Sequence, residues 1–213
     1  MRPLRDLWEG GLALHGTAWI FVLQAIPAWA DALQYDRRRI AAGEVWRLVT
    51  GHLAHWSWGH ALWDGVAFAL LVALALRLDR RRLPVVLLAS AVAISLAVWF
   101  AEPGLRLYRG LSGIDAALFA FVAAALVRRG GRARLVGGIA LLLLGAKIAW
   151  EMTTGGTLFV AAVDAGFVTV ALAHWVGAAV GLAVGFSRSQ TERALGRPRR
   201  LSWVSRQLRG SAS

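Results

Sequence analysis

The sequence predicts an all-α integral membrane protein with six transmembrane helices. Its residues are 58% hydrophobic and only 17% charged, whereas a soluble domain is about half apolar and about one quarter charged. Mean hydropathy is +0.56. Apolar runs of about 17 to 25 residues, enough to cross roughly 30 Å of hydrocarbon, recur along nearly the whole chain. We expect one membrane domain over residues 1–187 and a basic, flexible cytoplasmic tail over residues 188–213.

The predicted spans follow one another through short connections, except for a long one between Asp31 and Trp58. They cover residues 12–31, 59–76, 83–101, 111–127, 135–152 and 165–187. Short connections favour sequential up-and-down helices. Because His15, Gln24 and Pro27 interrupt the first stretch and no clear cleavage site follows it, we predict a retained helix there rather than a signal peptide.

Arginines at the ends of the apolar runs set the predicted orientation. The net charge is +12, and most of the arginines fall on the side that holds residues 77–82, residues 128–134 and the tail. The excess of basic residues on cytoplasmic loops predicts that both termini are cytoplasmic. A nucleic-acid binder would gather its arginines on a face with aromatic platforms. This distribution instead fits the anionic head groups of a lipid bilayer, and we expect no nucleic-acid partner.

Polar and reactive side chains inside the predicted spans fall into one layer. Counted from the cytoplasmic end of each span, Ser112 lies about 24 Å up, His174 about 21 Å and His60 about 25 Å. A second set lies roughly 20 Å up by the same count: Asp64, Asp115 and Lys147. Such groups are costly in hydrocarbon, so the layer indicates a functional site.

The fourth predicted span is too short to cross the whole core. Residues 102–109 should therefore dip inward, and Ser112 should begin a short helix inside a cavity. Backbone amides at a helix N-terminus can hold an oxyanion. Gly110 and Gly113 flank Ser112 and permit a tight turn and the close approach of a peptide. Glycine–serine segments are also common packing elements in membrane helices, so the motif alone decides little.

His174 begins a small-xxx-small pattern with Gly177 and Gly181, which lets another helix approach closely. A lone histidine on such a helix is more often a packing residue than a base. Combined with Ser112 and His60 at the same depth, however, it favours a catalytic pair in which Ser112 is the nucleophile and His174 the general base.

Three segments resemble the rhomboid family of intramembrane serine proteases. Residues 46–55, followed by His60 and Asp64, are similar to that family's WR and His-x4-His-x3-Asn patterns. Residues 110–113 and 173–181 resemble its GxSG and AHxxGxxxG motifs. The pattern around Tyr35, Arg37 or Arg38, Gly43, Glu44, Trp46 and Arg47 is most similar to rhombosortases, bacterial members proposed to process proteins with a C-terminal glycine-glycine sorting helix.

The resemblance implies a six-helix rhomboid-like bundle in a bacterial inner membrane, a single-pass membrane-protein substrate and no cofactor. His60 would donate to the oxyanion together with the Ser112 amide. His55 and the Trp46–Arg47 pair would be structural and would brace the long loop. For the tryptophans at positions 46, 56 and 58, a role purely at the membrane surface fits the sequence equally well.

Asp64 departs from the family pattern, because a carboxylate cannot donate a hydrogen bond and would repel an oxyanion. Burial could keep Asp64 protonated, or Lys147 at similar depth could neutralise it. Asp115 could pair with Lys147 instead. The anomaly motivates an alternative, a catalytically weak or inactive rhomboid-like binder or chaperone.

Two further classes are less compatible with the sequence. A small transporter would also hold polar groups at membrane depth, but the chain lacks repeated halves. A metal site at His52, His55 and His60 lacks a carboxylate at suitable spacing. Cysteine is absent, which excludes thiolate ligands and disulfides. We therefore predict no metal.

Overall fold

The computed structural model describes residues 17–156 and 171–187. Residues 17–25 are helical, and this helix is interrupted at Ile26 before the next helix begins. The helices are α2 (Pro27–Leu33), α3 (Arg37–Ala41), α4 (Arg47–Thr50), the 3-10 turn η1 (Gly51–Leu53), α5 (Trp58–Asp79), α6 (Leu83–Ala101), α7 (Ser112–Arg129), α8 (Gly131–Thr154) and α9 (Ala171–Phe186). Two short strands, β1 (Tyr35–Asp36) and β2 (Leu107–Tyr108), pair antiparallel.

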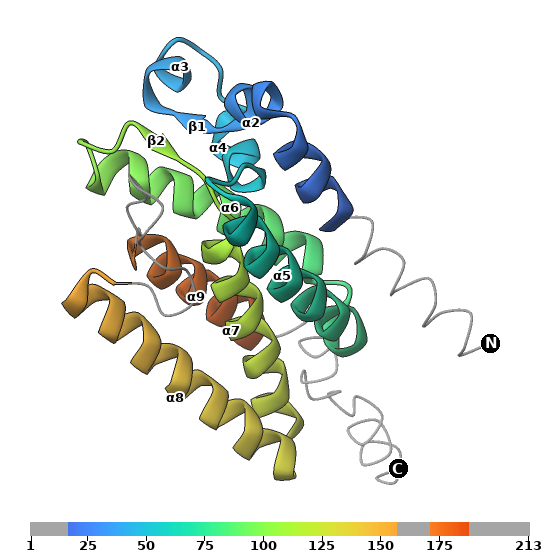
Figure 1. Cartoon of the computed structure of the whole chain (residues 1–213). Helices are drawn as coiled ribbons and strands as arrows, with labels where there is room; N and C mark the ends of the chain where they lie inside the picture. The colour runs from blue at the N-terminus through green and yellow to red at the C-terminus, as the bar shows by residue number, and fades with distance from the viewer. Residues whose placement is uncertain (1–16, 157–170, 188–213) are drawn as a thin grey trace, which may run out of the picture.

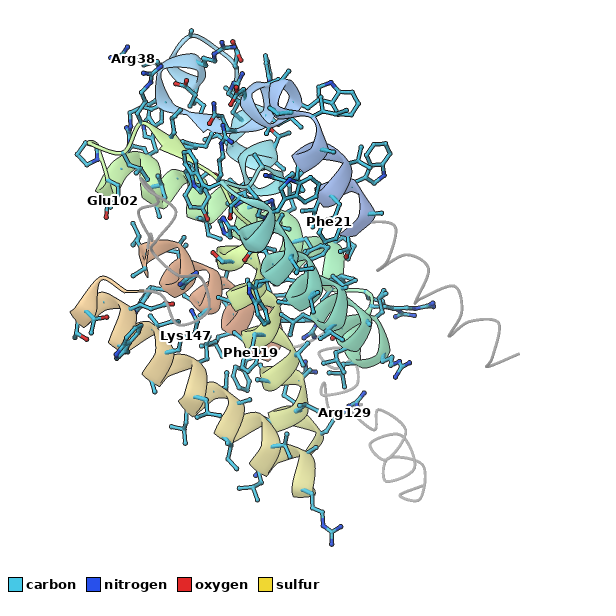
Figure 2. All side chains as sticks on the ribbon, viewed as in Figure 1. Phe21, Arg38, Glu102, Phe119, Arg129 and Lys147 are labelled. Carbon is cyan, nitrogen blue, oxygen red and sulfur yellow. The ribbon has the colours of Figure 1, made fainter. Side chains whose placement is uncertain are left out.

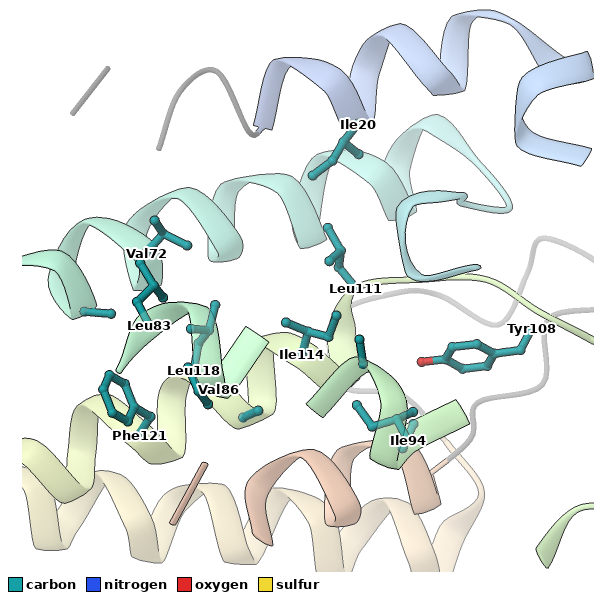
Figure 3. Close-up of a cluster of buried hydrophobic side chains, with 14 of the residues drawn as sticks. Ile20, Val72, Leu83, Val86, Ile94, Tyr108, Leu111, Ile114, Leu118 and Phe121 are labelled. Carbon is teal, nitrogen blue, oxygen red and sulfur yellow. The ribbon is translucent and has the colours of Figure 1, made fainter. Parts of the chain in front are cut away.

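Helix α7 is the central element, with α5, α6, α8 and α9 packed around it (Figure 1). Its buried positions are mostly small: Gly113, Ala116, Ala117, Ala120, Ala123, Ala124 and Ala125. Small side chains let neighbouring helices approach closely, which is how helices associate when lipid supplies no hydrophobic contrast. Larger buried side chains, among them Ile94, Leu111 and Phe121, fill the space between α5, α6 and α7 (Figure 3).

The long connection between the first two predicted spans is folded rather than irregular. Strand β1 pairs with β2 in the register Tyr35↔Tyr108. Arg37 donates to the carbonyls of Val98, Trp99 and Glu102 at 2.8–2.9 Å, which satisfies acceptors at the C-terminal end of α6. These contacts fix the segment that leads into Ser112. The strands were not expected from the sequence, because each is only two residues long.

Ser57 caps the N-terminus of α5. Its hydroxyl accepts a hydrogen bond from the His60 amide at 3.1 Å, as N-cap serines commonly do. His60 and Asp64 then lie one turn apart on the same face of α5. The cap therefore fixes where α5 begins and, with it, the positions of these two buried side chains.

Helices α5, α6 and α8 are each long and apolar enough to cross a membrane, and α9 is a shorter apolar helix. Leu142 is 75% exposed and Phe100 is 77% exposed, as expected for side chains that face lipid. The predicted spans 59–76, 83–101, 111–127 and 135–152 agree with α5, α6, α7 and α8 to within one helical turn. The six-span count and the positions of the termini stay predictions, and the predicted tail lies outside the described residues.

Candidate active site

Ser112 is the first residue of α7 and is only partly buried. Leu111 occupies the N-cap position, and no side chain caps the helix there in the usual way. The amides of Leu111 and Ser112 are therefore free of helical carbonyl partners and point out of the helix end, where partial positive charge accumulates. The predicted helix start at Ser112 is confirmed.

Gly110 makes the turn into α7. Its φ is +128°, a conformation that residues with a side chain rarely adopt. A Cβ at this position would also lie 2.9 Å from the ring of His60 and 3.5 Å from Asp64. The absence of a side chain thus lets the turn before Ser112 pack directly on α5.

The α7 and α9 backbones meet beside Ser112 and His174. A Cβ at Gly177 would overlap the carbonyl oxygen of Gly113, and a Cβ at Gly113 would lie 3.1 Å from the carbonyl oxygen of Ala173. Gly181 makes the same kind of contact with Ala117 one turn further along. The chain neighbours of Ser112 and His174 are therefore in contact, although no hydrogen bond between described residues joins the two side chains.

His174 is buried, and its ring contacts α8. The Nδ1 atom lies 2.6 Å from Oε2 of Glu151 and 3.5 Å from Nζ of Lys147. Nε2 makes no hydrogen bond to a described residue. This nitrogen is consequently the one left to meet a serine hydroxyl.

Asp64 occupies the helix N-terminus beside Ser112. Its Oδ2 atom accepts hydrogen bonds from the amides of Leu111 at 2.9 Å and Ser112 at 3.1 Å. The Nε2 atoms of His55 and His60 lie 3.3 and 3.2 Å from the same oxygen. Oδ2 thus acts as an acceptor, at the position where an oxyanion would be held.

Lys147 is placed with neither aspartate. Its Nζ atom donates to Oε1 of Glu151 at 2.6 Å, and Figure 2 shows it on the side of α8 that faces the bundle. The sequence-based alternative in which Lys147 neutralises Asp64 is wrong, as is its pairing with Asp115. Asp115 is buried, and its Oδ1 atom has no partner among the described residues.

The residues expected to brace the long loop divide into different roles. Arg47 is buried and donates to the carbonyls of Asp31 and Gln34 at 3.1 and 2.7 Å. Trp46 is 52% exposed and makes no such contact. His55 contributes to the site itself, because its ring stacks edge-on against His60 with centroids 5.0 Å apart.

His52 lies apart from the other two histidines of its sequence cluster. Its Nε2 atom is 3.0 Å from the Ala91 carbonyl and 3.2 Å from Ser95 Oγ, both on α6. Over residues 17–156 and 171–187, no group of three or more histidine, aspartate or glutamate side chains is arranged to hold a metal ion.

Glu151 is the site residue that the sequence analysis missed. It lies inside the predicted span 135–152 and one turn after Lys147, and oppositely charged residues at that spacing pair on a helix face. A count from Arg134 also puts it about 25 Å up, level with Ser112. Its depth and its spacing from Lys147 are therefore the features of the sequence that indicate this residue.

The described site is a serine at a helix N-terminus, in contact with a histidine-bearing helix inside an apolar bundle. These features define a class, helical membrane proteins that hold a serine, a histidine and carboxylates inside an apolar bundle. A family model of the rhomboid domain matches residues 42–191, and the chain belongs to the rhomboid family. Members of this family are generally intramembrane serine proteases, which act on membrane-protein substrates within the lipid bilayer. No curated protein matches the chain.

Proposed function

We propose that the protein is an intramembrane serine endopeptidase that uses Ser112 and His174 to cleave a peptide bond in or near a transmembrane segment. The observation that carries the proposal is the contact of α7 with α9, where Gly113 meets Ala173 and Gly177. That contact joins the chain neighbours of Ser112 and His174, which supports their pairing as nucleophile and base. Family membership supports the same activity.

The proposed reaction begins when Ser112 Oγ attacks the substrate carbonyl carbon and His174 Nε2 takes the hydroxyl proton. His174 then gives that proton to the leaving amine. In the second half of the reaction His174 takes a proton from a water molecule that attacks the acyl-enzyme, and it returns the proton to Ser112 Oγ as the acid product leaves. The Ser112 amide and the His60 ring would stabilise the oxyanion. Asp64 Oδ2 has to withdraw from the amides first, because it already occupies the donors that an oxyanion would need.

The proposed substrate is a single-pass protein anchored in the inner membrane of a bacterium. The resemblance of residues 35–47 to rhombosortases supports substrates that end in a glycine-glycine sorting helix. Co-expression with such a protein should produce loss of its C-terminal segment, and the Ser112→Ala variant should leave the substrate intact. Processing that persists in the Ser112→Ala variant would exclude Ser112 as the nucleophile.

A fluorophosphonate probe tests the site without knowledge of the substrate. The detergent-solubilised wild-type protein should be labelled, whereas Ser112→Ala should not be, since the probe reacts with activated serine hydroxyls. His174→Ala should also abolish labelling, because the serine would lose its base.

One observation favours a second candidate, a weak or inactive rhomboid-like protein that binds membrane proteins. Asp64 Oδ2 already accepts hydrogen bonds from the two amides at the proposed oxyanion position. Under this alternative the wild type would resist the fluorophosphonate probe and would still co-purify with a membrane-anchored partner after Ser112→Ala.

A further inference from the structure

The carboxylate of Glu151 joins α8 to the proposed base. It is 2% exposed, and its two oxygens have different partners. Oε2 lies 2.6 Å from His174 Nδ1, and Oε1 accepts from Lys147 Nζ at 2.6 Å. The ammonium group balances the charge that the carboxylate brings into the bundle, which a buried carboxylate in apolar surroundings requires.

This contact determines which ring nitrogen of His174 carries the proton. An ionised carboxylate only accepts hydrogen bonds, so a 2.6 Å contact with Nδ1 requires a hydrogen on Nδ1. In a neutral imidazole the proton can be on one nitrogen only, and Nε2 then keeps its lone pair. Nε2 is the nitrogen that makes no hydrogen bond to a described residue, so the lone pair is available to a serine hydroxyl.

We infer that Glu151 is a positioning residue, the third member of a Ser112–His174–Glu151 arrangement. The inference rests on the proposed function. The hydrogen bond from Nδ1 to Oε2 holds the ring in the orientation and tautomer in which Nε2 takes the Ser112 proton. Glu151 itself takes no proton. It stabilises the imidazolium that exists between proton uptake from Ser112 and proton delivery to the leaving amine.

A purely structural role for the same contact gives a different expectation. Helix α8 is the least buried of the three long apolar helices in the described residues, so the pair could simply tether α8 to α9. A tether depends on shape and hydrogen bonding, which glutamine preserves and alanine does not. A carboxylate that fixes the tautomer of His174 acts through its negative charge, which glutamine lacks.

The order of two variants therefore separates the roles. The amide group of Glu151→Gln can donate to Nδ1, which moves the ring proton to Nε2 and blocks transfer from Ser112. We expect kcat for a membrane-anchored reporter to fall about 10³-fold or more with little change in KM. Glu151→Ala, combined with Lys147→Met so that the ammonium 3.5 Å from Nδ1 cannot donate to it, leaves the ring free to adopt either tautomer, so its loss should be smaller. Glu102→Gln, the same chemical change at an exposed carboxylate, is the matched control and should cleave at the wild-type rate.

Thermal unfolding in detergent and Ser112 labelling by the fluorophosphonate probe accompany the cleavage assay. A larger loss in the Glu151→Ala, Lys147→Met variant than in Glu151→Gln, following the loss of thermal stability, would overturn the inference. So would equal labelling of wild type and Glu151→Gln. An unlabelled wild type would overturn the proposed function and this inference together, whereas a labelled wild type with an unaffected Glu151→Gln variant would overturn this inference alone.

Ring ¹⁵N chemical shifts of the wild type provide a test that needs no destabilised variant. The chain has five histidines, and the signals that disappear in His174→Gln identify the ring. A proton on Nδ1 and none on Nε2 at neutral pH is the expected result. A proton on Nε2 would contradict it.

Discussion

Asp64 is the side chain on which the efficiency of the proposed protease depends. Its Oδ2 atom accepts from the Leu111 and Ser112 amides and contacts two histidine rings. Those are the groups that would otherwise stabilise a developing oxyanion. The amides of the resting site are thus already occupied by an internal acceptor, and a substrate carbonyl has to compete with it.

Asp64→Asn should raise the cleavage rate. The neutral amide removes the repulsion, and its NH₂ group can donate to the oxyanion. One oxyanion donor contributes about 10²- to 10³-fold in kcat, so a gain of at least roughly 10-fold is expected in a reporter cleavage assay. Asp79→Asn, the same change at the far end of α5, is the control and should have no effect. Complete loss of cleavage in Asp64→Asn would contradict the expectation.

His52 makes the stability of the loop sensitive to acid. Burial lowers the pKa of His52 from 6.5 to about 4, because the charged ring would lose its hydration. Between pH 6.5 and pH 4 the unfolded chain therefore binds a proton at His52 that the folded protein does not bind. Stability contributed by neutral His52 is present above pH 6.5 and is lost as the pH falls toward 4. The loss should reach about 3 kcal/mol.

Thermal unfolding of the wild type and of His52→Gln, measured in detergent from pH 7 to pH 4, checks this expectation. Glutamine can still donate to the Ala91 carbonyl but does not titrate in this range. The unfolding temperature of His52→Gln should therefore fall less steeply with acid than that of the wild type. Parallel curves for the two proteins would argue against His52 as the titrating group.

The packing of α7 against α9 sets the separation of the proposed nucleophile and base. Gly177→Ala would place a Cβ into the Gly113 carbonyl, so the helices must move apart. A misplacement of about 1 Å can reduce catalysis about 10²-fold, and overpacking typically costs about 1–3 kcal/mol. We expect a loss of cleavage on the order of 10²-fold and a lower unfolding temperature.

Gly138→Ala is the matched control for that change. Gly138 lies on α8, and a Cβ there would meet nothing within 4 Å. An alanine is favoured over glycine inside a helix, so this variant should cleave normally and unfold at or above the wild-type temperature. Equal damage from both substitutions would mean that the α7–α9 contact is not what the first variant disturbs.

Much of the molecule follows from periodic and positional properties of its sequence. The helices α5 to α8 were predicted from apolar length alone, and the start of α7 at Ser112 followed from a span too short to cross the core. A common level for Ser112, His174 and His60 was predicted from depth, because rise per residue converts sequence position into height.

Contacts that depend on rotation about a helix axis could not be predicted in this way. Depth counting put Lys147 level with Asp64 and Asp115, but its side chain contacts Glu151 and His174 instead of either aspartate. The position of Asp64 Oδ2 on the Leu111 and Ser112 amides depends on the turn at Gly110 and is equally invisible in the sequence.

The orientation of the whole molecule can be tested because the chain contains no cysteine. Single-cysteine variants at the exposed positions Glu102 and Arg129 lie on opposite sides of the membrane in the predicted topology. A membrane-impermeant maleimide should label Glu102→Cys in intact cells and Arg129→Cys only after permeabilisation. The reverse pattern would invert the proposed topology.

The contact at Gly177 also has a genetic consequence. A Cβ there would meet the backbone carbonyl of Gly113, which no substitution on α7 can remove, so Gly177→Ala should have no compensating mutation on that helix. At Gly185 the opposing atom is the Cβ of Ala124 at 2.6 Å. Damage from Gly185→Ala should accordingly be suppressed by Ala124→Gly. A selection for restored cleavage should recover second-site revertants on α7 for Gly185→Ala but not for Gly177→Ala.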